Sequence, residues 1–258
     1  MRSVIAFVNP KGGSSKTTSV FSLGAALAAQ GHRVLLLDLD PLAGLTVSAG
    51  LEVGATGDHT VLRWLVTPNQ GVQGVAVHLA EGMSIIPGGL ELAGLEARLG
   101  TQKKAMFLVR NALQREPLAF DFVLVDTPPG INALVVAGLV AADAVIVPVQ
   151  SSYLSMFGVR AALDLINNLQ RNKQLALYRV GVLLTMVSST SMHAGEVVTE
   201  VRAVFPELTF TTMIPESDAL REAPVAGHSV LTYAPDDPAA QAYRALAEEV
   251  GAYGWSAG

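Results

Sequence analysis

Short runs of consecutive apolar residues alternate along the chain with longer segments in which apolar positions recur every three or four residues. Short runs rich in Val, Ile and Leu are typical of strands that are buried on both faces of a parallel sheet. The clear runs occupy residues 3–9, 33–40, 120–126, 144–149 and 179–186. Weaker candidates for strands are residues 83–88 and 209–214.

The segments between these runs have the pattern of helices. The first extends from about Lys16 to Gln30, and Gly31 follows it as an expected C-terminal cap. Near the other end, Asp237 and Pro238 are typical of the N-cap and the first position of a helix. Strands that alternate with helices predict right-handed crossovers. We therefore expect an α/β fold, with a mostly parallel twisted sheet and helices on both faces.

The sequence contains no evident linker, repeat or low-complexity tract, so we expect a single domain over residues 1–258. In open α/β sheets, ligands bind beyond the carboxyl ends of the strands. That rule selects a set of loops for closer study. They are residues 9–18, 38–46, 126–130, 150–158 and 186–191.

Composition narrows the possible functions. Half of the residues are apolar and 15% are charged, which suits a chain with a substantial core. There is no cysteine, which excludes disulfides, thiolate metal sites, iron–sulfur clusters and cysteine nucleophiles. The net charge of -5 provides no overall basic field for nucleic acid. We expect a cytoplasmic protein.

The most apolar segment, residues 133–149, is interrupted by Asp143 and Pro148. Its two halves are more typical of a helix followed by a buried strand than of a membrane span. We therefore expect no membrane partner.

The stretch NPKGGSSKTTS, residues 9–19, has the composition of a phosphate-binding loop between a strand and a helix. Such a turn presents backbone N–H groups and the positive end of the helix to phosphate. Gly12 and Gly13 allow the backbone to approach the phosphates closely. Lys16 is placed to reach the β- and γ-phosphates, and the Thr17 hydroxyl to bind Mg²⁺. These features predict a site for a nucleoside triphosphate and Mg²⁺; the resemblance described below implies that the nucleotide is ATP.

Carboxylates follow two of the predicted strands. Asp126 ends the run 120–126, where a Walker B acid holds Mg²⁺, usually through water. Asp38 and Asp40 end the run 33–40; one of them would orient the attacking water and the other would serve the metal. Helix capping is the alternative for such residues, and for Asp38 the two interpretations stay open.

Several segments together resemble one family. KGGSSKTT resembles the deviant Walker A motif, KGGxGKTT, of the ParA/MinD ATPases. HRVLLLDLDPLAGLT and FDFVLVDTPPG are similar to the segments that carry its switch I and Walker B acids. AADAVIVPVQSSYLSMFGV and MIPESDALREAPVAGHSVLTYAP extend the similarity over essentially the whole chain. The resemblance points to a P-loop NTPase fold and to the Soj-like partitioning ATPases.

This resemblance implies a role for each matched position. Lys11 matches the signature lysine that crosses a dimer interface to the partner's ATP phosphates, and Asp40 matches the aspartate required for hydrolysis. The implied catalytic residues are Lys11, Lys16 and Asp40, and the implied metal ligands are Thr17, Asp40 and Asp126. The implied nucleotide-binding residues are Lys11, Gly12, Gly13, Ser14, Ser15, Lys16, Thr17 and Thr18, with Met186 and Pro215 at the adenine. For Met186, core packing is the alternative.

The chain departs from the family pattern at Ser15, which replaces the second glycine of the loop. If this position requires a positive φ, serine costs on the order of 1 kcal/mol. If it requires only a small residue, serine costs little. We favour the second interpretation, because the other site residues are retained. Leu42 replaces a glutamine, and we expect slow hydrolysis.

The expected DNA-binding surface departs further. Glu216 and Ala219 stand where the family has basic residues, and Ser188 and Thr190 replace its Asp and Arg. The remaining basic residues of the C-terminal half are Arg160, Arg171, Lys173, Arg179, Arg202, Arg221 and Arg244. A second basic group, more typical of a solvated helix face, comprises Arg98, Lys103, Lys104, Arg110 and Arg115.

We predict a partitioning ATPase that dimerises with ATP, binds DNA without sequence preference and is stimulated by a ParB-like partner, in the cytoplasm or on the nucleoid. The alternative is a related positioning or regulatory ATPase for a protein cargo, with weak or no DNA binding. A MinD-like membrane switch is disfavoured, because no Lys or Arg follows Arg244 to form a basic amphipathic helix. Iron–sulfur relatives would need cysteines.

Overall fold

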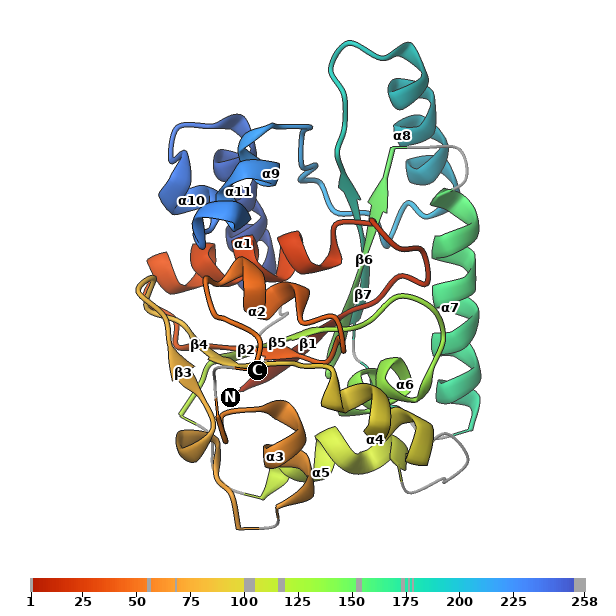
Figure 1. Ribbon diagram of the computed structural model, residues 1–258. Coiled ribbons are helices and arrows are strands. Elements are labelled where there is room, and N and C mark those ends of the chain that lie inside the picture. Colours follow the sequence, from red (N-terminus) through yellow and green to blue (C-terminus); the bar gives the residue numbers. More distant parts are fainter. Residues whose placement is uncertain are drawn as a thin grey trace.

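The arrangement of the chain is given by a computed structural model (Figure 1). It describes residues 2–54, 57–67, 69–99, 105–115, 119–151, 155–172, 175, 177 and 179–252.

The strands form one sheet with the order β3-β4-β2-β5-β1-β6-β7. Their bounds are β1 (Ser3–Phe7), β2 (Val34–Asp38), β3 (Val77–His78), β4 (Ser84–Ile86), β5 (Phe122–Asp126), β6 (Ala144–Gln150) and β7 (Arg179–Thr185). Every pairing is parallel except that of β3 with β4, at the edge. The predicted mostly parallel sheet is therefore confirmed, and each clear apolar run contributes a strand.

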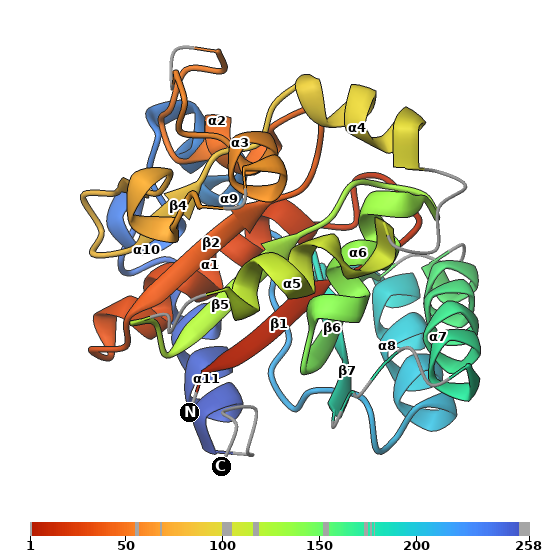
Figure 2. The same cartoon turned by 90° about the horizontal axis from the view of Figure 1, so that it is seen from below.

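Helices cover both faces of the sheet and flank its β7 end (Figures 1 and 2). The α-helices are α1 (Lys16–Ala29), α2 (Gly44–Ser48), α3 (Val61–Val66), α4 (Glu91–Leu99), α5 (Leu108–Gln114), α6 (Ala133–Ala141), α7 (Ser155–Arg171), α8 (Met192–Val204), α9 (Ala219–Glu222), α10 (Val230–Tyr233) and α11 (Pro238–Ala252). Short 3₁₀ helices are η1 (Val72–Gly74), η2 (Ala105–Phe107) and η3 (Ala223–Ala226).

The strands bury side chains on both faces, which explains their uninterrupted apolar runs. On β5, Val123 and Val125 belong to a core cluster that includes residues of α3, α5, α6, α7 and α8. Leu124, on the opposite face, packs in a second cluster with residues of α1 and α11, among them Tyr243. Two cores on one sheet hold its carboxyl edge rigid, and the candidate site lies at that edge.

The helix boundaries follow the predicted signals. Gly31 has a φ of +89°, as a C-terminal cap after α1 requires. Asp237 accepts a hydrogen bond from the Ala239 N–H at 2.8 Å and caps α11. The apolar segment 133–149 divides into α6 and β6. Within the described ranges, no helix combines the length and apolar character that a bilayer span needs.

The prediction of a strand at residues 209–214 was wrong. This segment lies beside β7, where the Phe210 N–H donates to the Val182 carbonyl at 3.0 Å, but it forms only an isolated bridge. The N–H groups of Thr211 and Thr212 instead donate to the carboxylate of Glu249 on α11, at 2.8 and 3.0 Å. These two N–H groups are therefore not available to pair with a neighbouring strand.

Candidate nucleotide site

The ends of three central strands bring the predicted carboxylates together. Asp126 at the end of β5 lies opposite Phe7 of β1 on one side and opposite Asp38 of β2 on the other. The loop from Asn9 to Ser15 leaves the adjacent end of β1 and enters α1. Parallel register therefore places the glycine-rich loop beside the acids, as the strand-end rule predicts.

The loop uses left-handed backbone at two positions. Gly13 has a φ of +72°, and Ser15 has a φ of 65° with a ψ of 24°. The expectation that position 15 needs only a small residue was wrong: the turn into α1 needs a positive φ there. A serine carries a Cβ that crowds this conformation, whereas a glycine does not. The loop therefore stores strain at Ser15.

The N-terminus of α1 keeps its backbone N–H groups uncapped by side chains. Ser15, the N-cap residue, makes no capping hydrogen bond, whereas Asn132 caps α6 and Ser191 caps α8. The Ser14 hydroxyl is buried and has no hydrogen-bond partner within the described chain. Uncapped donors and the positive helix end suit an anion such as a phosphate group.

Lys16 is buried at the start of α1, with a relative exposure of 7%. Its Nζ donates to the carbonyl of Asn9 at 3.1 Å. Burial lowers the pKa of Lys16, and the nearby charges of Asp126 and Asp40 partly oppose this shift. Binding of an anion beside the loop would therefore stabilise the charged form of Lys16.

Asn9 supports the loop, and our sequence analysis assigned it no role. Its Oδ1 accepts from the Lys11 N–H at 2.9 Å, and its Nδ2 donates to the Pro148 carbonyl at 2.7 Å. A Cβ at Gly158 would lie 2.7 Å from Asn9 Oδ1, so a larger residue there would displace the Asn9 side chain. An Asn directly after a buried strand, within a loop selected by the strand-end rule, was the available signal.

Asp126 has the properties of a metal-shell carboxylate. The Thr17 hydroxyl donates to its Oδ2 at 2.7 Å. Its Oδ1 is buried without a hydrogen-bond partner among the described residues. Burial, followed by the charge of Asp38, raises the pKa of Asp126 to about 8. A carboxylate oxygen that protein groups leave unsatisfied, beside a threonine hydroxyl, fits the donor chemistry of Mg²⁺ and its water ligands.

Asp38 and Asp40, whose roles the sequence left open, differ in their hydrogen bonds. Asp38 is fully buried, and its Oδ2 accepts from the N–H and the hydroxyl of Thr46 at 2.9 and 2.7 Å. Its Oδ1 accepts from the Asp40 N–H at 3.1 Å. Burial raises its pKa to about 6 despite these bonds. Asp38 therefore ties β2 to α2, whereas Asp40 is only partly buried.

In the part of the chain that the structure describes, no group of three or more His, Asp or Glu side chains could hold a metal ion alone. A magnesium ion at this edge would therefore depend on Thr17, a carboxylate, water and phosphate oxygens. Such a mixed shell is typical of Mg²⁺ in phosphoryl-transfer proteins.

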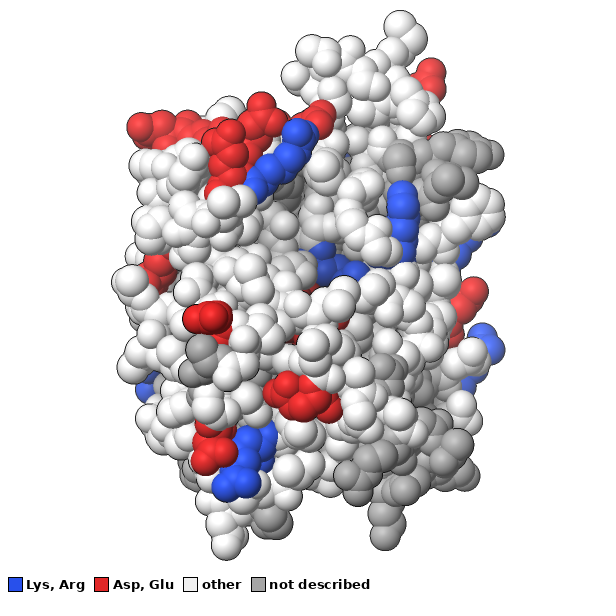
Figure 3. Space-filling view, in the orientation of Figure 1, with Lys and Arg blue, Asp and Glu red and all other residues white. Residues whose placement is uncertain are grey.

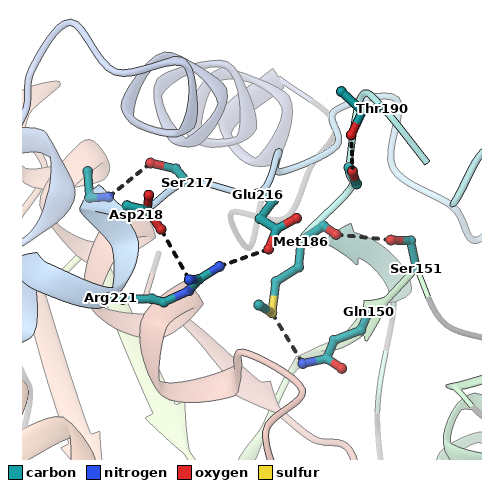
Figure 4. A network of polar contacts seen from close by, with 10 residues as sticks. Gln150, Ser151, Met186, Thr190, Glu216, Ser217, Asp218 and Arg221 are labelled. Carbon is teal, nitrogen blue, oxygen red and sulfur yellow. Dashed lines mark hydrogen bonds and ion pairs between the residues drawn. The ribbon is translucent and has the colours of Figure 1, made fainter.

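The residues expected at the adenine lie together beyond the end of β7. The Val187 N–H donates to the Ile214 carbonyl at 3.0 Å, and Val187 forms a bridge with Pro215. Met186 has a φ of +52° and is only partly buried. Figure 4 shows its side chain directed toward Gln150.

Acidic side chains dominate the expected DNA-binding corner. Arg221 pairs with Glu216 at 2.8 Å and with Asp218 at 3.1 Å (Figure 4). Figure 3 shows acidic side chains gathered over α9 and α10. The exposed acids of this segment are Glu216, Asp218, Glu222 and Asp236. Arg221 is therefore engaged by carboxylates that would themselves repel phosphate.

Other expected cations are held by the protein. The Arg115 guanidinium donates to the carbonyls of Trp64, Leu65 and Thr67. Arg202 and Arg244 each donate to a backbone carbonyl. Lys103, Lys104 and Lys173 lie outside the described residues, as does the side chain of Arg98. The described cations thus form no compact basic patch around α9 and α10.

A parallel sheet with a glycine-rich loop, a buried loop lysine and strand-end acids defines a P-loop nucleotide-binding protein. More narrowly, the chain belongs to the ParA/Soj/MinD family of ATPases: a family model described as an AAA domain matches residues 2–178, and full-length relatives agree.

The sporulation initiation inhibitor protein Soj of Bacillus subtilis is 34% identical over 254 residues, 98% of this chain and 100% of that one. The chromosome-partitioning ATPase Soj of Thermus thermophilus is 37% identical over 246 residues, 95% of this chain and 94% of that one. A structure of cobyrinic acid a,c-diamide synthase from Mycobacterium smegmatis, with bound ADP and magnesium, has a TM-score of 0.83 and 34% identity, covering 99% of this chain and 96% of that one.

Proposed function

We propose that the protein binds ATP with Mg²⁺ at the loop between β1 and α1 and hydrolyses it slowly. The observation that carries this proposal is the grouping of Lys16, Thr17 and Asp126, with one buried carboxylate oxygen still unsatisfied. The similarity to a structure that holds ADP and magnesium supports the same choice of ligands.

Each residue has a distinct task in this proposal. The backbone N–H groups of Gly13, Ser14 and Ser15 would donate to phosphate oxygens. Lys16 offsets the negative charge of the phosphates. Their attraction would draw its Nζ away from the Asn9 carbonyl. Thr17 and Asp126 would hold Mg²⁺, which when bound would neutralise charge on the phosphates.

Asp40 lies close enough for its charge to act on the pKa values of both Lys16 and Asp126. Its Oδ1 accepts from the Leu42 N–H at 2.9 Å, which fixes the carboxylate at the rim of the site. We assign it to orienting the attacking water. This carboxylate can accept a proton from that water as the water oxygen attacks the terminal phosphorus. The bond from that phosphorus to the bridging oxygen breaks, and ADP leaves with that oxygen.

We further propose that the ATP-bound protein is a homodimer, with the nucleotide edge of the sheet as the interface. Lys11 is only partly buried at this edge and would reach the partner's phosphates. Large apolar side chains are exposed in segments that follow β2, β4, β5 and β6. They are Leu42, Leu90, Ile131 and Phe157, with relative exposures of 73%, 67%, 55% and 65%. Exposed apolar side chains around a ligand site are typical of a protein interface.

For the role in the cell, we propose a partitioning ATPase in the cytoplasm, with non-specific DNA and a ParB-like protein as partners. Its full-length similarity to partitioning proteins supports this role. The ion pairs of Arg221 and the acidic corner favour the second candidate, an ATPase that positions a protein cargo with weak or no DNA binding.

A DNA titration separates the two candidates. Binding of a random duplex would be measured with ATP, with ADP and without nucleotide, each at a low and a high salt concentration. ATP-dependent binding that weakens steeply with salt is expected of the partitioning role. Absence of binding, with the ATP dimer intact, would select the cargo role instead.

A further inference from the structure

Gln150, the last residue of β6, links two parts of the proposed site that are distant in the sequence. Its Nε2 donates to the carbonyl of Gly13 in the phosphate loop. The same nitrogen lies 3.2 Å from the thioether sulfur of Met186 (Figure 4). One amide group therefore contacts both the loop for the phosphates and the residue expected at the base.

Ser151, the residue after Gln150, also contacts Met186. The Ser151 hydroxyl donates to the Met186 carbonyl at 2.9 Å, and the Ser151 N–H donates to the Thr185 carbonyl at 3.3 Å. Met186 has a left-handed φ of +52°, which a long side chain adopts only when its surroundings impose it. The end of β6 thus supports a strained residue through a side chain and a backbone contact.

The two groups that Gln150 contacts are both hydrogen-bond acceptors, which favours an amide at this position over other side chains. A carbonyl oxygen accepts hydrogen bonds, and a thioether sulfur accepts them weakly. The –NH₂ group of glutamine carries two donor hydrogens, so it can serve both acceptors together. A leucine would fill the space without donating, and an ionised glutamate would oppose both acceptors.

We propose that Gln150 is a positioning residue that couples the base pocket to the phosphate loop. When a base packs against Met186, the thioether sulfur shifts. The Gln150 amide, which contacts this sulfur and the Gly13 carbonyl, moves with it and so changes the position of the Gly13 carbonyl. The loop then adopts the arrangement that receives the phosphates. This inference rests on the proposed nucleotide site and adds a reason for that site to distinguish a nucleoside triphosphate from inorganic triphosphate.

A tie with only a structural role would give a different result from a coupling residue. Loss of a structural tie weakens the loop for every ligand equally. Loss of coupling weakens only the advantage that the base confers. The decisive quantity is therefore the ratio of the affinity for Mg²⁺-ATP to that for Mg²⁺-tripolyphosphate, which has no base.

Calorimetric titrations would compare the wild type with Gln150→Leu. The matched control is Gln70→Leu, since the Gln70 amide also donates to a glycine carbonyl, that of Gly74 at 3.1 Å. Coupling between sites is typically worth a factor of 5 to 150, so we expect Gln150→Leu to lower the ratio about tenfold. Gln70→Leu should leave it unchanged. Equal losses for both ligands with Gln150→Leu would overturn the proposal.

A second variant covers the case in which Gln150→Leu does not fold. Gln150→Glu has nearly the same shape, but at pH 8 its ionised carboxylate donates to neither acceptor. The ratio of its affinities for Mg²⁺-ATP and Mg²⁺-tripolyphosphate at pH 8 should therefore fall about tenfold below the wild-type ratio. An unchanged ratio in this variant would contradict coupling. If the wild type binds neither ligand, the proposed nucleotide site itself fails, which is a separate outcome.

Discussion

The hydroxyl of Thr17 donates to Asp126 Oδ2 at 2.7 Å, across a sequence separation of 109 residues. The second residue of α1 thus meets the last residue of β5. The contact exists because β1 and β5 are parallel neighbours, so the loop after β1 and the acid at the end of β5 share one edge. Two of the three predicted metal ligands, Thr17 and Asp126, are therefore in direct contact.

Replacement of Lys16 by alanine should abolish ATP binding. Its ammonium is buried at the loop, and no other lysine in the described chain lies in α1 to replace it. Isothermal titration with a non-hydrolysable ATP analogue measures the effect. The thermal midpoint without nucleotide serves as the folding check. A folded variant with unchanged affinity would place the triphosphate elsewhere.

Replacement of Asp40 by alanine should stop hydrolysis while leaving ATP in place, so a dimer should accumulate. Asp40 is half-exposed at the rim, and its loss removes the group that orients water. Light scattering with ATP measures the mass, and phosphate release measures turnover. Asp58→Ala is the matched control, because Asp58 is exposed and pairs only loosely with Arg63, at 3.8 Å. A strictly monomeric ATP-bound variant would contradict the dimer.

Magnesium affinity should rise with pH up to about 8. The folded protein holds the pKa of Asp126 at about 8, and a carboxylate must lose its proton to bind a metal. Below that pKa, release of one proton changes the apparent affinity by up to about tenfold per pH unit. Titration of Mg²⁺ with ADP present, from pH 7 to 9, would test this. A flat profile over this range would mean that Asp126 is not a ligand.

The raised pKa of Asp126 also predicts that the stability of the ligand-free protein depends on pH. The pKa of Asp126 is raised above the unfolded value of about 3.9, so the folded state binds more protons between these pH values. Stability should therefore fall as pH rises from about 5 to 8. Thermal midpoints over this range measure it. Asp126→Asn should flatten the decline, leaving the smaller part from Asp38, whose pKa is about 6.

Ser15→Gly should stabilise the protein slightly. A left-handed backbone costs a non-glycine residue about 1–2 kcal/mol, and the greater freedom of unfolded glycine offsets up to about 1 kcal/mol of that. We expect a gain of at most about 1 kcal/mol, visible as a rise of about 2 °C in the thermal midpoint. Ser14→Gly, one residue earlier and without positive φ, should instead destabilise. Destabilisation by both would refute the strain at Ser15.

Much of the architecture was predictable because local patterns carry it. Apolar runs such as 120–126 can be buried only between two helix layers, and β5 lies there. The segment 209–214 was mispredicted, because Glu249, remote in the sequence, captures its N–H groups. That residues 1–258 form a single domain stays a prediction, as do the roles of the individual site residues.

By itself, the sequence indicated the five clear strands, the first and last helices, the predicted phosphate loop and the edge at which ligands should bind, because periodicity, turn residues and motif spacing are local properties. Only the tertiary structure decided that Ser15 has a left-handed backbone conformation. It also decided that Thr46 donates hydrogen bonds to Asp38 and that Arg221 forms ion pairs with carboxylates. It alone joined Gln150 to Gly13 and Met186. The reason is physical: backbone angles at a turn and hydrogen-bond partners depend on which distant segments the folded sheet brings within a few ångströms.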